Sequence, residues 1–230
     1  AIGIAWSVIR PLLTLGVMAF IGWLFSSKVP GDVPRLLLVG AATLPWTFFS
    51  TSFSEASNSL ITNSNLLTKV YFPRLIVPAS TVIVCLIDFL ISFAILLILM
   101  IIYRFAPDIK ILLLPLFLLL GLITSLGSGR LIAALNVKYR DFRYIVPFIV
   151  QIWMYVSPVV YPLSLVPPRY RTLYALNPMA GIIQTFRVVL LRTGEVPWGT
   201  LGVSTIVGMT LFLAGTLYYR RTEHLFADVA

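Results

Sequence analysis

The sequence predicts an all-α integral membrane protein with about six transmembrane helices. Hydrophobic residues make up 59% of the 230 positions and charged residues only 11%, and the mean hydropathy is +0.98. A soluble domain of this size could not cover so apolar a chain with polar groups. Apolar runs also recur at lengths near the roughly 20 residues that a helix needs to cross a bilayer. No composition shift divides the chain, so residues 1–230 are predicted to form a single transmembrane domain.

The predicted spans, in chain order, are residues 4–25, 36–56, 76–103, 111–135, 145–161 and 199–219. The third would be about 42 Å long as a helix, which exceeds the bilayer core and requires tilt or protrusion. The fifth would be only about 25 Å long and is interrupted by Pro158, as is typical beside a re-entrant or water-lined region. The Pro- and Tyr-rich stretch that follows, to residue 192, predicts two short helices dipping into the outer leaflet.

A polar, Asn-rich segment, residues 57–74, separates the second and third spans. A segment this polar cannot lie in hydrocarbon, and it is therefore predicted to be a water-facing hinge. If this hinge is cytoplasmic, nine of the 17 Lys and Arg lie on the inner face and eight on the outer face. The positive-inside rule therefore hardly discriminates between the two possible orientations of the chain. The dense basic loop at residues 138–143 does fall inside, and both termini are predicted to be cytoplasmic.

The basic residues argue against nucleic-acid binding despite the net charge of +9. They lie at span ends and in connectors rather than in one stripe interleaved with aromatic residues. Cys85 is the only cysteine, so one chain can form no disulfide, and His224 is predicted to be a solvated surface residue. The sequence contains no G-x-x-x-x-G-K-S/T string and no clustered acids or Ser-His-Asp set. We therefore expect no enzyme activity, no metal site and no cofactor on this chain.

Three motifs are specific enough to compare with known families: NSNLLTKVYFPRLIVPAS (63–80), ALNVKYRDFRYIVPFIVQIWMYVSPVVYP (134–162) and SPVVYPLSLVPPRYRTLYALNPMAGIIQTFRVVLLRTG (157–194). They resemble the membrane subunits of ABC exporters of the type-2 family, in the branch that moves O-antigen, teichoic acid and related lipid-linked polysaccharides. The resemblance implies a first cytoplasmic loop that docks on a separate ABC ATPase subunit, which holds ATP and Mg. It also implies a homodimer in the cell inner membrane, with the hinge passing motion from the ATPase to the spans.

The resemblance further implies that an amphipathic interface helix, which precedes the first span in this family, is missing here. The chain begins at Ala1 almost directly on an apolar run, without the pattern of a signal peptide.

Candidate residues for contact with the ATPase lie in the hinge: Asn58, Asn63, Asn65, Lys69 and Arg74. In the second basic loop, Arg140 and Arg143 are candidates for binding a lipid head group, because guanidinium groups bind phosphates through paired donors. Anchoring to anionic membrane lipids is the simpler role for these cations. Glu55 has two open roles: pairing with Lys69 or Arg74, or contact with the ATPase.

Asp88 lies near the middle of an apolar span, where a charge costs about 2.5–3.5 kcal/mol on insertion scales. It is predicted either to contact an ion or substrate in the translocation path or to hold helices together, for example through Ser92. In the next span, small residues recur every four positions at Gly121, Ser125, Gly129 and Ala133. They predict close helix packing or, alternatively, a smooth wall beside the substrate.

Four residues in the fifth predicted span, Tyr144, Phe148, Gln151 and Tyr155, share one face of a helix. Aromatic rings stack on the apolar patches of sugars and an amide serves their hydroxyls, so this face is predicted to line a glycan path. An ordinary interfacial aromatic belt is the alternative. Trp46, Phe48, Phe49, Trp153 and Tyr161 are further candidates. The outer gate is assigned to Tyr161, Pro162, Tyr170, Asn177 and Pro178 by the resemblance.

The function that these expectations support is export of a lipid-linked polysaccharide, with two copies of the chain enclosing the path. Export of a drug or smaller lipid is the alternative within the family. A membrane enzyme acting on polyprenyl-phosphate sugars is the alternative from another class, because it would share aromatic and Arg-rich faces.

Overall fold

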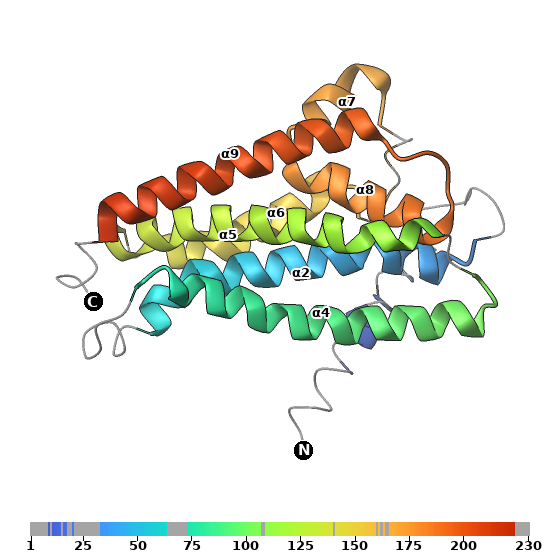
Figure 1. Ribbon diagram of the computed structural model, residues 1–230, viewed down its shortest axis with the longest axis horizontal. Coiled ribbons are helices and arrows are strands. Elements are labelled where there is room, and N and C mark those ends of the chain that lie inside the picture. The colour runs from blue at the N-terminus through green and yellow to red at the C-terminus, as the bar shows by residue number, and fades with distance from the viewer. Residues whose placement is uncertain are drawn as a thin grey trace.

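The computed structural model describes residues 9, 11–14, 16, 17, 20, 33–63, 73–106, 109–139, 141–159, 161, 163 and 166–223. The regular elements from residue 33 onward are all helical. They are α2 (Arg35–Thr62), α4 (Ile76–Ile102), the 3-10 helix η1 (Ile109–Leu113), α5 (Leu114–Lys138), α6 (Phe142–Val156), α7 (Pro168–Ala175), α8 (Pro178–Leu191) and α9 (Trp198–Thr222) (Figure 1). The predicted all-α class is confirmed.

Four helical stretches in the described part of the chain are long and apolar enough to cross a membrane: Leu36–Thr62, Ile76–Ile102, Ile109–Lys138 and Trp198–Thr222. They match the predicted second, third, fourth and sixth spans, and α4 ends one residue before its predicted end. The bent pair α7–α8 adds a fifth if it is counted as one span. The predicted first span, residues 4–25, lies mostly outside the described residues.

Helix α2 is the centre of the bundle. It lies between α4 and α5, and α5 in turn lies between α2 and α9 (Figure 1). In its most apolar stretch 78% of residues are buried, against 22% in both α4 and α9. The most apolar helix, α4, is thus among the most exposed, which is the arrangement expected where lipid rather than water surrounds the bundle.

The fifth predicted span is shorter than expected. Helix α6 ends at Val156, not at 161, and its 15 residues extend only about 22 Å. Ser157 directly precedes Pro158, and a residue before proline avoids the helical region. Its backbone is accordingly extended, with φ −100° and ψ 148°. Pro158 therefore ends the helix, and α6 by itself is too short to cross the bilayer core.

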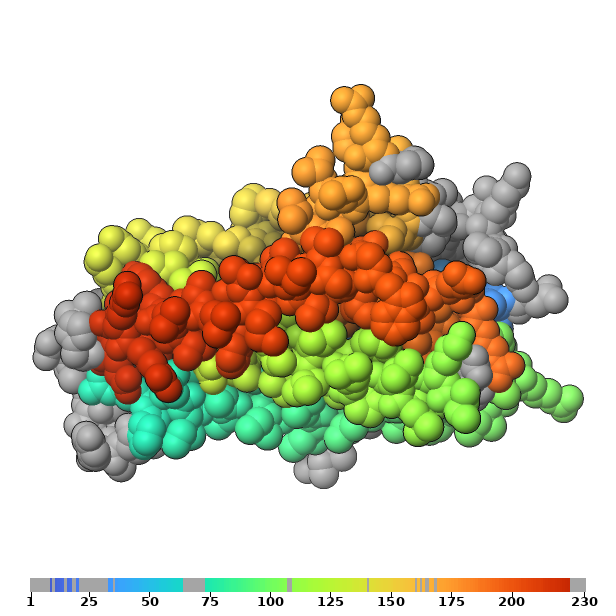
Figure 2. Space-filling model, turned by 45° about the horizontal axis from the view of Figure 1, so that its top comes forward, coloured from blue at the N-terminus to red at the C-terminus, as the bar shows by residue number. Residues whose placement is uncertain are grey.

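Two short helices follow, as predicted. Helices α7 and α8 meet at an angle of 102° across Leu176 and Asn177, and Figure 2 shows α7 projecting from the body beside α9. Helix α8 lies inside the bundle, packed against α9 and α2, and 13 of its 14 residues are buried. Only α7 of the predicted gate pair is therefore at the surface.

The stripe of small residues on α5 packs against α2, as one of its two predicted roles requires. Ser125 and Ala133 are fully buried. A Cβ atom added at Gly129 would lie 2.6 Å from the Cβ of Ala56 on α2, so only glycine fits this contact. On another side of α5, a Cβ at Gly127 would overlap the main chain of Phe212 on α9. Glycines of α5 thus set its distance to both neighbouring helices.

We expect Gly129→Ala to lower the stability of the bundle by about 1–3 kcal/mol, because α2 and α5 would have to separate. The measurement is the thermal unfolding midpoint of the purified protein in nanodiscs. Gly202→Ala on α9 is the matched control, since nothing lies within 4 Å of a Cβ at that position. Alanine should there be neutral or stabilising by up to about 1 kcal/mol through its helix propensity. Equal midpoints for the two variants would contradict a tight α2–α5 contact.

Candidate functional site

The polar hinge begins later than the sequence predicts. Residues 57–62 belong to α2, and Ser57 and Ser59 are buried. Their hydroxyls donate to the carbonyls of Phe53, at 2.6 Å, and Ala56, at 2.7 Å. Serine can remain inside a helix when such local hydrogen bonds satisfy it. The predicted start of the hinge at residue 57 is therefore wrong, and the helix continues to Thr62.

The two described asparagines of the hinge make different contacts. The Asn63 amide donates to the carbonyl of Ser59 at 2.8 Å, within its own helix. The Asn58 amide donates to the carbonyl of Ser54 at 3.0 Å, and its oxygen accepts from Asn136 of α5 at 3.3 Å. Asn136 is fully buried and also donates to the carbonyl of Ser57 at 3.1 Å. This link between α2 and α5 was not predicted. Asn65 and Lys69 lie outside the described residues.

Arg74 connects the start of α4 to the end of α9. Its guanidinium donates to the carbonyl of Glu223, which caps α9, and the Tyr219 hydroxyl donates to the carbonyl of Arg74 at 2.8 Å. A cation is favourable at the negative C-terminal end of a helix dipole. The end of α2, the start of α4 and the ends of α5 and α9 therefore lie together at one end of the bundle (Figure 1).

The basic loop before α6 lies at the same end. Arg143 is exposed in the first turn of α6, and Arg140 lies outside the described residues. Glu55 is exposed on α2. Within the described part of the chain, no three His, Cys, Asp or Glu side chains are placed to hold a metal ion.

Helix α6 has two different faces. Tyr144, Phe148 and Tyr155 are 80%, 63% and 64% exposed, and Gln151 is exposed with them. On the other side, Val146 is fully buried, and the Trp153 ring packs edge-on against Phe49 and Phe53 of α2 with centroids 5.0 and 6.0 Å apart.

The other aromatic candidates for a glycan path divide differently. Trp46, Phe48 and Phe49 of α2 are at most 4% exposed, so they belong to the core rather than to an open path. Their packing around the centre of the bundle, not an orientation toward solvent, accounts for this aromatic cluster.

Asn177 holds together the end of the bundle where α6 ends and α8 begins. Its side-chain oxygen accepts from Trp153 Nε1 at 2.9 Å and from the main-chain N–H of Met179 at 3.0 Å, so it caps α8. Its amide donates to Ser157 Oγ at 2.9 Å and to the carbonyl of Val156 at 3.3 Å. One side chain thus joins the end of α6 to the start of α8.

Ser204 of α9 extends this network. Its hydroxyl lies 3.1 Å from the carbonyl of Ala175 and 3.0 Å from that of Asn177, and it accepts from the N–H of Gly181 at 3.1 Å. Pro178 follows Asn177 at the first position of α8, where its lack of an N–H costs nothing. The corner between α7 and α8 is therefore fixed from α6 and α9.

The remaining gate residues lie at the surface side of this corner. The hydroxyls of Tyr161 and Tyr174 are hydrogen-bonded to each other, and Tyr161 also donates to the carbonyl of Tyr155 at 2.9 Å. Tyr170 on α7 is 51% exposed. Pro162 lies outside the described residues.

Arg187 of α8 was not predicted as a site residue, although it is 1% exposed. Its guanidinium donates to the carbonyls of Pro158, at 3.0 Å, and Val159, at 2.9 Å, and to that of Tyr161 at 3.3 Å. These carbonyls follow the end of α6. A cation in a helix with apolar neighbours on both sides was the only sequence signal for it.

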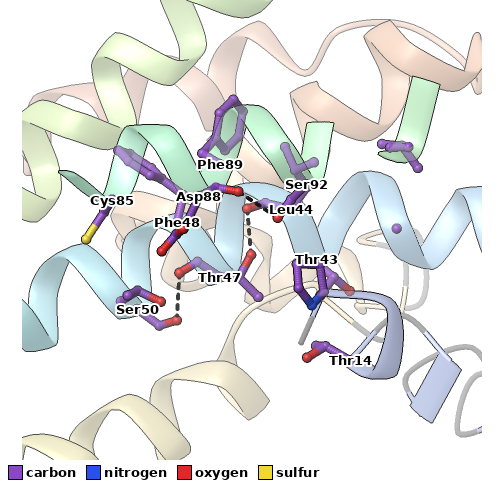
Figure 3. A pocket seen from close by; sticks show the side chains of 14 residues that line it. Thr14, Thr43, Leu44, Thr47, Phe48, Ser50, Cys85, Asp88, Phe89 and Ser92 are labelled. Carbon is purple, nitrogen blue, oxygen red and sulfur yellow. Dashed lines mark hydrogen bonds between the residues drawn. The ribbon is translucent and has the colours of Figure 1, made fainter. Parts of the chain in front are cut away.

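Asp88 is exposed on α4 and lines a cavity between α2 and α4 (Figure 3). The predicted link to Ser92 takes a different form, because the Ser92 hydroxyl donates at 2.8 Å to the main-chain carbonyl of Asp88 and not to its carboxylate. A hydroxyl in a helix commonly bonds the carbonyl one turn earlier.

The curated relatives carry transport names. The chain is 28% identical over 228 residues, 96% of this chain and 86% of the relative, to the O-antigen export system permease protein RfbA of Myxococcus xanthus. It is 24% identical to the RfbA protein of Klebsiella pneumoniae, over 99% of this chain and 87% of that protein. It is 25% identical to the polysialic acid transport protein KpsM of Escherichia coli, over 96% of this chain and 87% of that protein.

A family model describes what these relatives have in common. The model of the ABC-2 type transporter matches residues 1–191, from the first residue to the end of α8. The match includes the first two sequence motifs, the third as far as residue 191, and the corner at Asn177. This chain therefore belongs to the ABC-2 type transporter family.

Proposed function

We propose that this chain is the membrane subunit of an ATP-driven exporter that moves a lipid-linked polysaccharide across the inner membrane. The exposed face of α6, with Tyr144, Phe148, Gln151 and Tyr155, is the observation that carries the proposal. Three aromatic rings and an amide in one row suit a chain of sugars, each with apolar patches and hydroxyls. The names of the relatives, which export O-antigen or transport polysialic acid, support the same substrate class.

Two copies of the chain would enclose the path. The exposed face of α6 is one side of a short helix and cannot surround a glycan, so a second copy would supply the opposite wall. A separate ABC ATPase, with ATP and Mg, would supply the energy, because ABC-2 transporters work with such a partner.

The ATPase would act at the end of the bundle where Arg74 meets α9. Arg74, Tyr219 and Asn136 join α2, α4, α5 and α9 there. A displacement of the hinge would consequently reach three further helices at once rather than bending a free loop. Arg143 lies at the same end and would receive the pyrophosphate head group of the lipid carrier.

Deletion of the gene in its host should leave a lipid-linked glycan on the cytoplasmic side, and mass analysis of that material would identify it. Export of a drug or smaller lipid predicts no such glycan. A membrane enzyme acting on polyprenyl-phosphate sugars predicts a glycan of altered structure rather than a complete one that accumulates.

The face of α6 can be tested with single cysteines at Tyr144, Phe148, Gln151 and Tyr155 in a Cys85→Ala background. We expect all four to react with a charged, water-soluble thiol reagent, and lipid-linked glycan trapped in the exporter should protect them. Val146→Cys is the buried control. Val156 lies on another face of α6 by sequence, but it is 48% exposed and would therefore be a poor buried control. Leu213→Cys on α9, 56% exposed among apolar residues, tests whether exposure alone suffices.

If the four α6 cysteines react at the same rate as Leu213→Cys, and glycan does not protect them, the face of α6 does not line the glycan path. A lipid-facing belt would instead leave the α6 cysteines as unreactive as that at Val146, since charged reagents do not enter hydrocarbon.

A further inference from the structure

A cavity of about 320 Å³ lies between α2 and α4, with Pro11 and Thr14 at its side (Figure 3). Thr47 is the thirteenth residue of α2, and Asp88 is the thirteenth of α4. Each is about 20 Å from the start of its helix, so the cavity lies near mid-depth in the bundle. It is separate from the exposed face of α6 and from the corner at Asn177.

Four hydroxyl groups that line this cavity can act toward it only as acceptors. The hydroxyls of Thr43, Thr47, Ser50 and Ser92 all line it, and each donates its hydrogen to a main-chain carbonyl, at 2.8, 3.0, 3.1 and 2.8 Å respectively. A hydroxyl has one hydrogen and two lone pairs, so these four groups can offer the cavity only lone pairs. A ligand that binds them must donate hydrogen bonds or carry positive charge.

The carboxylate of Asp88 lines the same space. No cationic side chain within the described ranges forms an ion pair with it. A carboxylate at mid-depth in a membrane protein is costly unless a positive charge accompanies it. The four hydroxyl acceptors around it would stabilise that positive charge further.

The other walls are apolar and aromatic. Leu44 and Leu96 are buried on opposite helices, and the rings of Phe48 and Phe89 meet edge to face with centroids 5.5 Å apart. Aromatic faces attract cations, and the leucines suit an alkyl chain. The volume is about ten times the share of one water molecule in liquid water, so a bare metal ion would leave most of it empty.

We propose that this cavity binds an amphiphilic ammonium compound, with the ammonium group at Asp88 and the hydroxyls and the alkyl part between the aromatic and leucine side chains. The site is independent of the glycan path, and its test does not require export.

Cys85 provides the test, because it lines this cavity and is the only cysteine of the protein. The purified chain in nanodiscs is treated with methyl methanethiosulfonate, a small neutral thiol reagent, and the modification of Cys85 is followed by intact-protein mass. Three additives that share a six-carbon chain are compared: n-hexylammonium, 1-hexanol and hexanoate. At ten times its dissociation constant, hexylammonium should slow the reaction about tenfold, because about one site in ten remains open. Hexanol and hexanoate should slow it far less.

The matched variants are Asp88→Asn, which removes the charge at the cavity, and Asp141→Asn, the same change at an exposed position before α6. Protection by hexylammonium should be lost in Asp88→Asn and kept in Asp141→Asn. Equal protection by hexanol, or protection that survives in Asp88→Asn, would reduce the site to an apolar cavity and overturn the proposal. Calorimetric titration of the unmodified protein with hexylammonium is the second measurement, and absence of Asp88-dependent binding heat would also overturn it.

Discussion

Replacing Asn177 with Leu is expected to lower the stability of the bundle by about 3 kcal/mol or more, since a buried polar group left unpaired costs about 1–3 kcal/mol. The substitution removes the acceptor for Trp153 Nε1 and for the N–H of Met179, and it removes the donor to Ser157 Oγ. The start of α8 would also lose its cap. The measurement is the thermal unfolding midpoint in nanodiscs.

Two further variants separate the roles of this side chain. Asn177→Asp keeps an acceptor for Trp153 and Met179 but has no amide to donate to Val156, so its stability should lie between those of Asn177→Leu and the unchanged protein. Asn63→Leu is the matched control, because within the described ranges the Asn63 amide donates to the Ser59 carbonyl of its own helix and to no other helix. If Asn63→Leu and Asn177→Leu unfold at the same temperature, the corner between α7 and α8 does not depend on Asn177.

The helices of this bundle could be predicted from the sequence because their signals are local. A long apolar run identifies α4 wherever its neighbours lie, and its observed end at Ile102 differs from the prediction by one residue. Pro158 likewise acts on the residue directly before it, so a break in the fifth span could be expected. The predicted end of α2 is wrong because that prediction, too, used a local signal: a polar run of residues taken alone suggests a loop. Asn136, which satisfies the polar end of α2, is far away in sequence.

The contacts that position the candidate sites depend on tertiary structure. Nothing near Asn177 in sequence indicates that Trp153 and Ser204 will meet it, and Arg187 resembles any cation at the edge of a span. Periodicity places Tyr144 and its neighbours on one face, but whether lipid, a second copy or a glycan covers that face is decided by assembly. The hydroxyls near Asp88 are likewise unremarkable in sequence, because they come from two helices that pack side by side.

Arg187→Met should be the other strongly destabilising substitution, and the sign follows from two opposing effects. Burying a guanidinium without a carboxylate partner is costly, so an apolar side chain of similar length removes a desolvation penalty. The carbonyls of Pro158, Val159 and Tyr161, however, remain where they are, and each would lose a donor. Two buried acceptors and one partly buried acceptor, left unpaired at about 1–3 kcal/mol each, outweigh the relief, and a net loss of about 2–4 kcal/mol is expected.

Arg187→Lys distinguishes the charge of this residue from its shape. Lysine keeps the positive charge near the end of α6 but has one ammonium in place of the forked guanidinium. It therefore cannot donate to the carbonyls of Pro158, Val159 and Tyr161 together. Its unfolding midpoint should therefore lie much closer to that of Arg187→Met than to that of the unchanged protein. Arg171→Met, on exposed α7, controls for the loss of one arginine and should leave the midpoint unchanged within error. Full retention of stability in Arg187→Lys would mean that charge at the helix end, rather than the three directed hydrogen bonds, holds α8 against α6.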